Sequence, residues 1–432
     1  MLSKLNQLIS KIKASKDGKT LATNFGYLSL LQIASYFFPL ITMPYLAKTI
    51  GAEGFGKIAF AHAIMVWFTT IADWGFNFTA TRDVAKNRDD KDKVSDIFSN
   101  VLWARLFLML VSFVALFLLV SFIPKLRENA DVILVTFLLI PGHIMFPDWF
   151  FQAIERMKYI TILNLLSKTF FTIAVFIFVK EKSDYVIQPL LTSCGFLVSG
   201  MIAMYYILIK WKYKLRKPSI KKILNTIKES TNVFINNIMP NFYNAFSTML
   251  LSFIGGDVAT GILDAGKKVI GICEHILLVL SRTFFPFLAR RGDKHYMYEK
   301  ISLAISSLMA ICLFVFAPLI IKILFSPEFK EAITVLRIIS ISILSYSLKN
   351  VYSFNYMILR GYEKQSRNIM IICSLIGFIL SFPLVYMFSY IGASIVYVTT
   401  ISLMGLCSMI FVKRIEKKNE NIRIKRMGNK RP

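Results

Sequence analysis

The stretch GAEGFGKI at residues 51–58 has the glycine and lysine spacing of a phosphate-binding loop. Such a loop would cradle nucleotide phosphates with backbone N–H groups, a lysine and a metal-binding hydroxyl. Here Ile58 occupies the hydroxyl position, and Glu53 places a negative charge where the phosphates would lie. The loop also needs a buried strand before it, whereas Asn24 to Ile50 form an apolar run long enough to cross a membrane. The stretch therefore does not predict nucleotide chemistry.

Ionisable and amide side chains inside apolar segments are the second group that could do chemistry. Such groups are costly in lipid, so they face a bundle interior or a water-filled cavity. Helical spacing places them in stripes in both halves of the chain, which predicts a hydrated cavity between two lobes. The stripes contain His62, Asp73, Asp148, Lys168, Asn237, Asn241, Asn244, Asp264, Lys268, His275 and Arg282, with Lys267 beside the last group and Arg105 on a further segment.

Each stripe also has a purely structural interpretation. Asn side chains often hydrogen-bond to neighbouring helices without touching a substrate. Asp264 and Lys268 are four residues apart and could neutralise each other. Asp73, Arg282 and Arg337 lie near predicted span ends, where long or polar side chains can reach the interface. Lys168 and Arg105 lie deeper and are harder to explain in this way.

The elements that must position these residues are membrane helices. The chain has 432 residues, of which 56% are hydrophobic, and its mean hydropathy is +0.58. Only 18% of its residues are charged, against about 25% in ordinary soluble proteins. The five cysteines lie in apolar segments without metal or redox spacing, so neither a metal nor a disulfide is predicted.

Apolar runs of helical length recur along the whole chain and predict an all-α polytopic membrane protein with about twelve spans. The basic segment 210–229 divides them into an N-lobe, residues 24–209, and a C-lobe, residues 230–412. That segment is expected to lie on the membrane surface as an amphipathic helix. The spans are expected near 24–49, 57–79, 100–123, 131–154, 161–180, 186–209, 230–254, 259–283, 299–325, 332–358, 367–389 and 391–412.

Basic residues predict the orientation of these spans. Connecting segments on the side of the amino terminus hold 36 Lys and Arg residues, and those on the opposite side hold five. The positive-inside rule therefore places the basic tails, residues 1–23 and 413–432, in the cytoplasm. The net charge of +26 is then a topology and lipid-surface signal, and no nucleic acid is expected as a partner.

Several stretches carry a resemblance to a known family. FPLITMPYLAKTIGAEGFGKIAFAHAI (38–64) and DWGFNFTATRDVAKNRDDK (73–91) are the most specific, and PDWFFQAIERMKYIT (147–161), GGDVATGILDAGKKV (255–269) and SPEFKEAITVLRIISI (326–341) extend the match. The sequence resembles bacterial oligosaccharide repeat-unit flippases, the O-antigen and capsule translocases in the polysaccharide branch of the multidrug/oligosaccharidyl-lipid/polysaccharide exporter superfamily. In this light GAEGFGK is expected to be the tight outer turn between the first two spans.

The resemblance implies a transporter, not an enzyme, that moves polyprenyl-diphosphate-linked sugar repeats from the inner to the outer leaflet of the cytoplasmic membrane by alternating access. No cofactor or catalytic residue is implied, and membrane lipids, a polysaccharide polymerase and chain-length components are the further expected partners. An anionic headgroup needs cations along its path. We therefore expect substrate binding at Arg105, Lys168, Lys267, Lys268 and Arg282 with Asn237, Asn241 and Asn244, and ion coupling at His62, Asp73, Asp148, Asp264 and His275.

Other classes remain open at this point. An ion-coupled multidrug or cation exporter of the same fold would be expected to have an acidic cavity, whereas the deep charges here are mostly cationic. A polysaccharide polymerase would carry a large outer loop, and a glycosyltransferase would need paired carboxylates in an aqueous loop. The acidic residues Asp89, Asp90 and Asp92 are interleaved with basic ones and read as a solvated loop. A structural assembly subunit would not need charges within the membrane.

Overall fold

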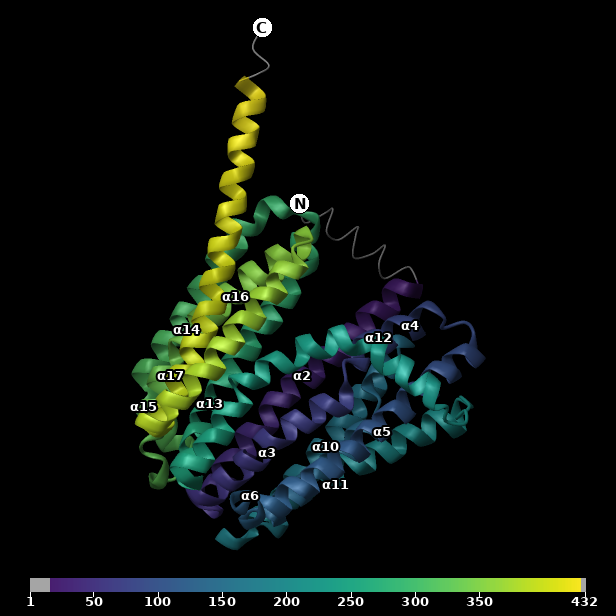
Figure 1. Cartoon of the computed structure of the whole chain (residues 1–432), viewed down its shortest axis with the longest axis vertical. Coiled ribbons are helices and arrows are strands. Elements are labelled where there is room, and N and C mark those ends of the chain that lie inside the picture. The colour runs from purple at the N-terminus through teal and green to yellow at the C-terminus, as the bar shows by residue number, and fades with distance from the viewer. Residues whose placement is uncertain (1–15, 429–432) are drawn as a thin grey trace. The chain divides into compact units, whose positions relative to one another are not determined.

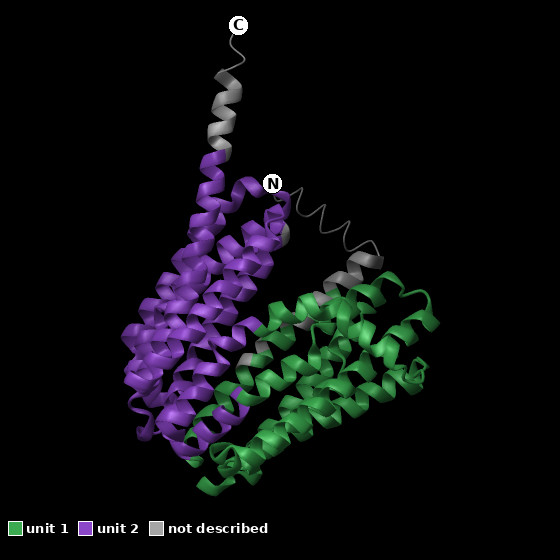
Figure 2. Cartoon of the chain, in the orientation of Figure 1, with its two compact units in different colours: residues 1–50, 64–238 green, residues 51–63, 239–432 purple. Residues whose placement is uncertain are grey.

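The computed structural model describes the backbone of residues 16–428 as a succession of helices (Figure 1). No strand occurs within this range, which confirms the all-α prediction. Residues 1–15 and 429–432, parts of the two predicted basic tails, lie outside the described residues. The chain divides into two compact units, coloured separately in Figure 2: unit 1 is 1–50 with 64–238, and unit 2 is 51–63 with 239–432.

Unit 1 is built from a long first helix and a set of shorter ones. Because α3 is assigned to unit 2 before residue 64, only its second part belongs here. The elements are α2 (Lys16–Thr49), α3 (Gly51–Asp73, from Ile64), α4 (Phe76–Lys86), α5 (Lys91–Phe122), α6 (Pro124–Glu128), α7 (Ala130–Phe137), α8 (Leu139–Met145), α9 (Asp148–Ala153), α10 (Met157–Phe178), η1 (Lys182–Val186), α11 (Ile187–Met204), η2 (Tyr205–Lys210) and α12 (Ile220–Ile238).

Unit 2 contains the two longest helices of the described chain. Each of them has one non-helical residue inside, Gly256 in α13 and Ser389 in α17. The elements are η3 (Met239–Phe242), α13 (Ala245–Arg290), η4 (Gly292–Lys294), α14 (His295–Leu324), η5 (Pro327–Phe329), α15 (Ala332–Ser340), α16 (Ser342–Lys349), η6 (Asn350–Met357), η7 (Ile358–Arg360) and α17 (Glu363–Gly428).

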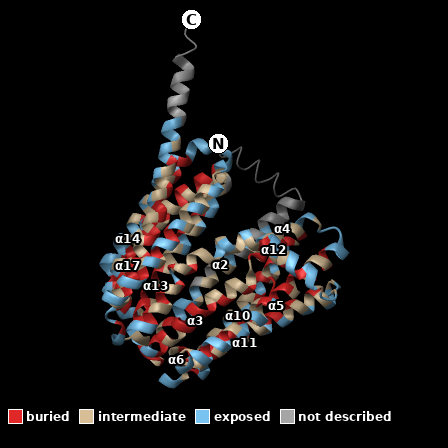
Figure 3. Ribbon diagram, in the orientation of Figure 1, coloured by how far each residue is buried: buried red, intermediate tan, exposed pale blue. Residues whose placement is uncertain are grey.

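Ten candidate membrane spans occur among the described residues, so the chain is a multi-pass membrane protein. Two of the ten hold α13 and α17, which are longer than one crossing needs. The exact number of twelve therefore stays a prediction. Large apolar side chains are exposed along α5 and α14, as a lipid-facing surface requires (Figure 3).

Several predicted spans are broken where the sequence predicted single helices, among them 332–358, which is divided into α15, α16 and η6. The span 57–79 is interrupted at Trp74 and Gly75, which both have left-handed backbone conformations. The span 131–154 is divided into α7, α8 and α9, with Pro147 between the last two. The span 230–254 is interrupted by η3, which contains Pro240. Proline lacks the N–H that continues a helix, and this accounts for the last two breaks.

The glycines of GAEGFGK have a different role from the predicted outer turn, and that prediction is wrong in detail. Only Gly51 lies at the turn, with φ of 69°, and the rest of the stretch is the start of α3. A Cβ atom on Gly56 would overlap the carbonyl oxygen of Asp257, and one on Gly261 would overlap that of Ala52. These glycines therefore allow α3 and α13 to cross with their backbones in contact.

The basic connection after α11 has no regular secondary structure over residues 212–219, so the surface helix predicted for 210–229 is present only from Ile220 onward. The backbone N–H groups of Lys214 and Arg216 donate to the hydroxyls of Ser95 and Ser99 on α5, at 3.1 and 2.8 Å. The Arg216 side chain also pairs with Asp92. These bonds satisfy backbone groups that a helix would satisfy internally, and α12 begins only at Ile220.

Candidate functional site

Unit 1 has a buried ion pair at the junction of α3, α4 and α5. Arg105 on α5 is 3% exposed and pairs with the carboxylate of Asp73, the last residue of α3. Its Nη2 also donates to the side-chain oxygen of Asn77 at 3.0 Å. The Nε and Nη1 atoms of Arg105 are buried and have no hydrogen-bond partner among the described residues. The guanidinium is thus paired at Nη2, while its other two nitrogens are buried and unpaired among the described residues.

The sequence at the α3–α4 junction explains why these groups meet. Gly75 adopts φ of 79°, which ends α3 and turns the chain into α4. The Trp74 ring stacks on Phe234 of α12 with centroids 3.8 Å apart, and the hydroxyls of Thr79 and Ser230 lie 2.7 Å apart. Contact with α12 therefore fixes the turn that carries Asp73.

Two further titratable groups belong to this cluster in unit 1. Asp148, at the start of α9, and His143, on α8, both interact electrostatically with Asp73 and Arg105. The Asp148 carboxylate accepts the backbone N–H of Trp149 at 2.7 Å, and the His143 ring stacks on Phe196. His143 was not among the predicted site residues, although its position in the same predicted span as Asp148 could have indicated it.

Lys168 lies by itself on α10 of unit 1. The side chain is partly buried and has no hydrogen bond or ion pair with another described residue. The Asn164 amide, one turn earlier, donates to the carbonyl oxygen of Ile160 at 2.9 Å and does not hold the lysine. Lys168 therefore keeps an uncompensated charge within this part of the chain.

Unit 2 places Lys267 of α13 among uncharged oxygen atoms. Its Nζ lies 3.2 Å from the carbonyl oxygen of Asn244, 2.9 Å from the Asn244 side-chain oxygen and 2.8 Å from the Thr248 hydroxyl. The ammonium also lies 5.6 Å from the centre of the Tyr397 ring of α17. These partners hold the cation in place without cancelling its charge.

A carboxylate lies near this lysine. Glu274, also on α13, accepts the hydroxyl of buried Tyr397 at 2.5 Å and interacts electrostatically with Lys267 and with Lys349 of α16. The ammonium of Lys349 lies 4.7 Å above the Tyr346 ring. Two cations therefore surround one carboxylate. Lys349 and Tyr397 were not among the predicted site residues, because neither shares a predicted span with Lys267.

Of the remaining predicted residues, Asn244 belongs to the Lys267 cluster and Asp264 lies near it, whereas the others lie outside both clusters. Lys268 forms an ion pair with Asp264 at 2.9 Å and lies 3.8 Å from the centre of the Phe55 ring. The predicted amide stripe is not continuous, because Asn237 is exposed on α12, Asn241 is buried in η3, and Asn244 precedes α13. His62, His275 and Arg282 are exposed.

The two clusters bring fixed charges and polar oxygen atoms together, an arrangement that suits the binding of ions. Within the described part of the chain, no three His, Cys, Asp or Glu side chains are placed to hold a metal ion. Lys267, Lys349 and Glu274 together carry one positive charge in excess if all are ionised, and the nearby Asp264 is paired with Lys268. Asp73, Asp148 and Arg105 carry one negative charge in excess on the same basis. Unit 2 is thus better suited to an anion, and unit 1 to a cation or proton.

Comparison with known proteins adds an independent finding. Residues 21–292 match the family described as "Polysaccharide biosynthesis protein". The "Putative O-antigen transporter" of Escherichia coli (strain K12) is 30% identical over 403 residues, which cover 91% of this chain and 97% of that protein. A protein of the same name from Shigella dysenteriae is 25% identical over 377 residues, with 86% and 93% covered.

The fold also resembles a solved structure. An inward-facing multidrug resistance MATE family transporter of the MOP superfamily aligns with a TM-score of 0.69 at 13% identity, over 90% of this chain and 98% of that one. At this identity the similarity concerns the fold alone.

Proposed function

Because the chain belongs to the polysaccharide biosynthesis protein family, we propose that it is a flippase for polyprenyl-diphosphate-linked oligosaccharide repeat units. The family confirms the resemblance found in the sequence. Both curated relatives are named as transporters and not as enzymes, in agreement with the absence of a predicted catalytic residue. The proposed direction is from the inner to the outer leaflet of the bacterial cytoplasmic membrane, by alternating access, for O-antigen or capsule synthesis.

The observation that carries this proposal is the environment of Lys267. A diphosphate must lose much of its water to cross the membrane, and a fixed cation offsets that cost. The hydrogen-bond acceptors of Lys267 are uncharged oxygens, which an anionic phosphate oxygen can displace or join. The ammonium is therefore held ready for an anion and is not consumed by an ion pair.

Other groups would assist at different stages of transport. Lys349 adds a second cation beside Glu274, and Lys168 adds one in unit 1. Tyr397 offers an aromatic face, and amides such as Asn241 could bind sugar hydroxyls weakly enough to release them. Lys268 is less suited to this role because Asp264 already neutralises it.

A second candidate function is favoured by the cluster in unit 1. Asp73 and Asp148 share a single cation, Arg105, and His143 lies within electrostatic range. Such a cluster could exchange protons or bind a coupling cation, as an ion-coupled exporter would require. We propose that it couples sugar-lipid transport to an ion gradient, with export of organic cations as the alternative.

The orientation of the protein and its partners are also part of the proposed function. Both termini are expected in the cytoplasm, where the basic connections meet anionic lipid headgroups. A polysaccharide polymerase and chain-length components are the expected partners on the outer side. A role in either O-antigen or capsule assembly would use the same transport step.

A vesicle assay tests the function directly. Purified full-length protein is reconstituted with a polyprenyl-diphosphate oligosaccharide carrying a fluorophore on its sugar, and a membrane-impermeant quencher reports its leaflet. We expect Lys267→Ala to slow flipping by about tenfold or more, since a charge-assisted hydrogen bond is lost. The neighbouring Lys268→Gln serves as the control and should flip near the wild-type rate. Flipping no faster than in protein-free vesicles, combined with gradient-driven uptake of a cationic dye, would contradict the flippase function and favour the exporter.

A further inference from the structure

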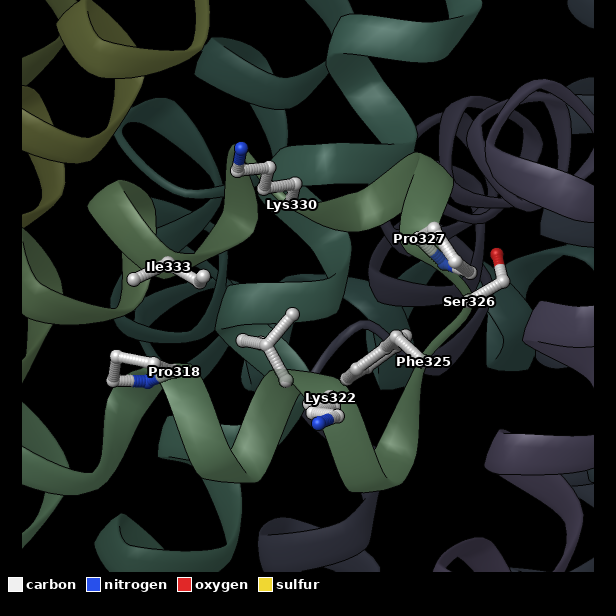
Figure 4. A pocket seen from close by; sticks show the side chains of 8 residues that line it. Pro318, Lys322, Phe325, Ser326, Pro327, Lys330 and Ile333 are labelled. Atoms are coloured by element: carbon white, nitrogen blue, oxygen red, sulfur yellow. The ribbon is translucent and has the colours of Figure 1, made fainter.

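A surface hollow lies at the end of α14 in unit 2, and its lining includes none of the residues of the two clusters. It has a volume of about 240 Å³ and lies where the chain passes from α14 through η5 into α15. Figure 4 shows apolar side chains around it and two lysines at its edges. Its lining residues are Pro318, Ile321, Lys322, Phe325, Ser326, Pro327, Lys330 and Ile333.

The two lysines at this hollow carry charge that no nearby carboxylate cancels. Lys322 and Lys330 are exposed, and neither forms an ion pair with another described residue. The acidic residues of the same loop are engaged elsewhere. Glu328 accepts the backbone N–H of Ala52 at 2.9 Å, and Glu331 hydrogen-bonds Tyr390 of α17. The segment 322–331 (KILFSPEFKE) has two lysines and two glutamates, but the fold turns its acids toward other helices.

A proline lines one end of the hollow. Pro318 has no N–H, so the carbonyl oxygen of Phe314, four residues earlier, lacks its helical donor. Arg337 of α15 supplies one, with its Nε at 3.4 Å from that oxygen, and its guanidinium lies 5.5 Å from the centre of the Phe314 ring. Arg337 thus places a third cation against α14, one turn before Pro318.

The position of the hollow in the chain indicates that it lies near the membrane surface. It lies at the ends of two candidate membrane spans, Gly292–Leu324 and Ala332–Arg360. Exposed apolar side chains, including Leu319 and Ile323, continue along α14 beside it. At such a boundary, Lys and Arg attract anionic headgroups while apolar surface contacts acyl chains.

We propose that this hollow binds an anionic glycerophospholipid of the adjacent leaflet. The headgroup phosphate lies between Lys322 and Lys330, and the acyl chains lie on the exposed apolar face of α14 beside Leu319 and Ile323. The volume admits a phosphate and glycerol but not a whole lipid, so the chains remain on the exposed face of α14. This site does not depend on the transported substrate, because its lining residues belong to neither polar cluster.

The test uses full-length protein in nanodiscs containing photoactivatable phosphatidylglycerol or phosphatidylcholine with identical acyl chains. Crosslinked lipid is mapped by mass spectrometry of chymotryptic peptides. We expect adducts on the 318–333 segment with phosphatidylglycerol and about tenfold fewer with phosphatidylcholine. The Lys322→Gln/Lys330→Gln variant should lose these adducts to the same extent, and Lys322→Arg/Lys330→Arg should keep them.

Two control variants distinguish binding in this hollow from a general electrostatic attraction between anionic lipids and basic residues. Lys294→Gln/Lys300→Gln removes the same charge from the opposite end of α14 and should leave the adducts on 318–333 unchanged. Ile333→Trp keeps both lysines but fills the hollow, and should reduce them. Equal labelling by the two lipids, or wild-type labelling of the Gln variant, would overturn the proposal. So would displacement of phosphatidylglycerol by inorganic phosphate or farnesyl diphosphate at equal concentration, which would assign the site to a free anion or a polyprenyl diphosphate.

Discussion

The ammonium of Lys267 in α13 lies 2.9 Å from the side-chain oxygen of Asn244, which directly precedes that helix and is 23 residues earlier in the chain. In a straight α-helix, residues so far apart in sequence would be separated by about 35 Å. The contact is possible because Gly256 has a non-helical conformation and α13 folds back on itself. One glycine thus brings a cation to the uncharged oxygens that hold it.

This relationship predicts that a carboxylate at position 244 will damage transport without unfolding the protein. Asn244→Asp keeps the shape of the side chain but neutralises Lys267, so we expect flipping to fall by about tenfold. Membrane abundance should remain normal. Asn237→Asp, on the exposed face of α12, is the matched control and should transport as wild type. Normal flipping by Asn244→Asp would exclude Lys267 as the diphosphate partner.

Arg105 is expected to matter for stability. Arg105→Ala would leave the carboxylates of Asp73 and Asp148 near one another without a cation, at a cost of about 3–5 kcal/mol. Thermal unfolding in detergent should show a large decrease in Tm. The double variant Arg105→Leu/Asp73→Asn removes both charges of the pair and should recover much of the loss. Equal destabilisation by the single and double variants would argue against a structural ion pair.

Lys168 is expected to matter for transport and not for stability. It forms no ion pair with a described residue, so its removal leaves no carboxylate without a cation. Lys168→Ala should abolish surface polysaccharide in cells that depend on this protein, while normal amounts of protein remain in the membrane. Lys168→Arg should retain part of the activity. Asn164→Ala tests the neighbouring polar group, which bonds only to its own helix, and should be tolerated. Wild-type polysaccharide from Lys168→Ala would remove this residue from the transport path.

The crossing of α3 and α13 predicts a strong effect of a single methyl group. Gly56→Ala and Gly261→Ala place a Cβ atom on a backbone oxygen, which cannot move like a side chain. We expect a loss of about 3 kcal/mol or more and little folded protein in the membrane. Gly271→Ala, where a Cβ meets nothing within 4 Å, should be neutral or slightly stabilising. Normal Tm values for the first two variants would contradict the backbone contact.

The predicted topology can be checked with reporter fusions. The positive-inside rule places Gly256 and Glu328 outside, and Lys93, Lys222 and Lys418 inside. Fusions with an enzyme active only outside the cytoplasm should therefore be active at 256 and 328 alone. Reporter activity at Lys222, which follows the basic connection at residues 212–219, would reverse the assignment of the cytoplasmic and outer sides.

Composition and hydropathy by themselves determined the class of this protein. In lipid, the backbone N–H and C=O groups of a long apolar run must be hydrogen-bonded within the run, as they are in a helix. The all-α membrane fold therefore follows from local sequence. The motif resemblance in residues 38–91 was specific enough to indicate the family. The kink at Gly256 was also foreseeable as a short turn, because a glycine pair interrupts an apolar run there.

The tertiary structure decided which charges are neutralised and which are held by uncharged groups. Arg105 and Asp73 were predicted to have separate roles, yet they form one ion pair, because the turn at Trp74 and Gly75 carries Asp73 to α5. Lys267 and Lys268 are adjacent in sequence, but a helix points them about 100° apart, toward Asn244 and toward Asp264. Sequence spacing gives the face of a helix that a residue occupies. The partner on that face depends on which helix packs there, and only long-range folding sets that.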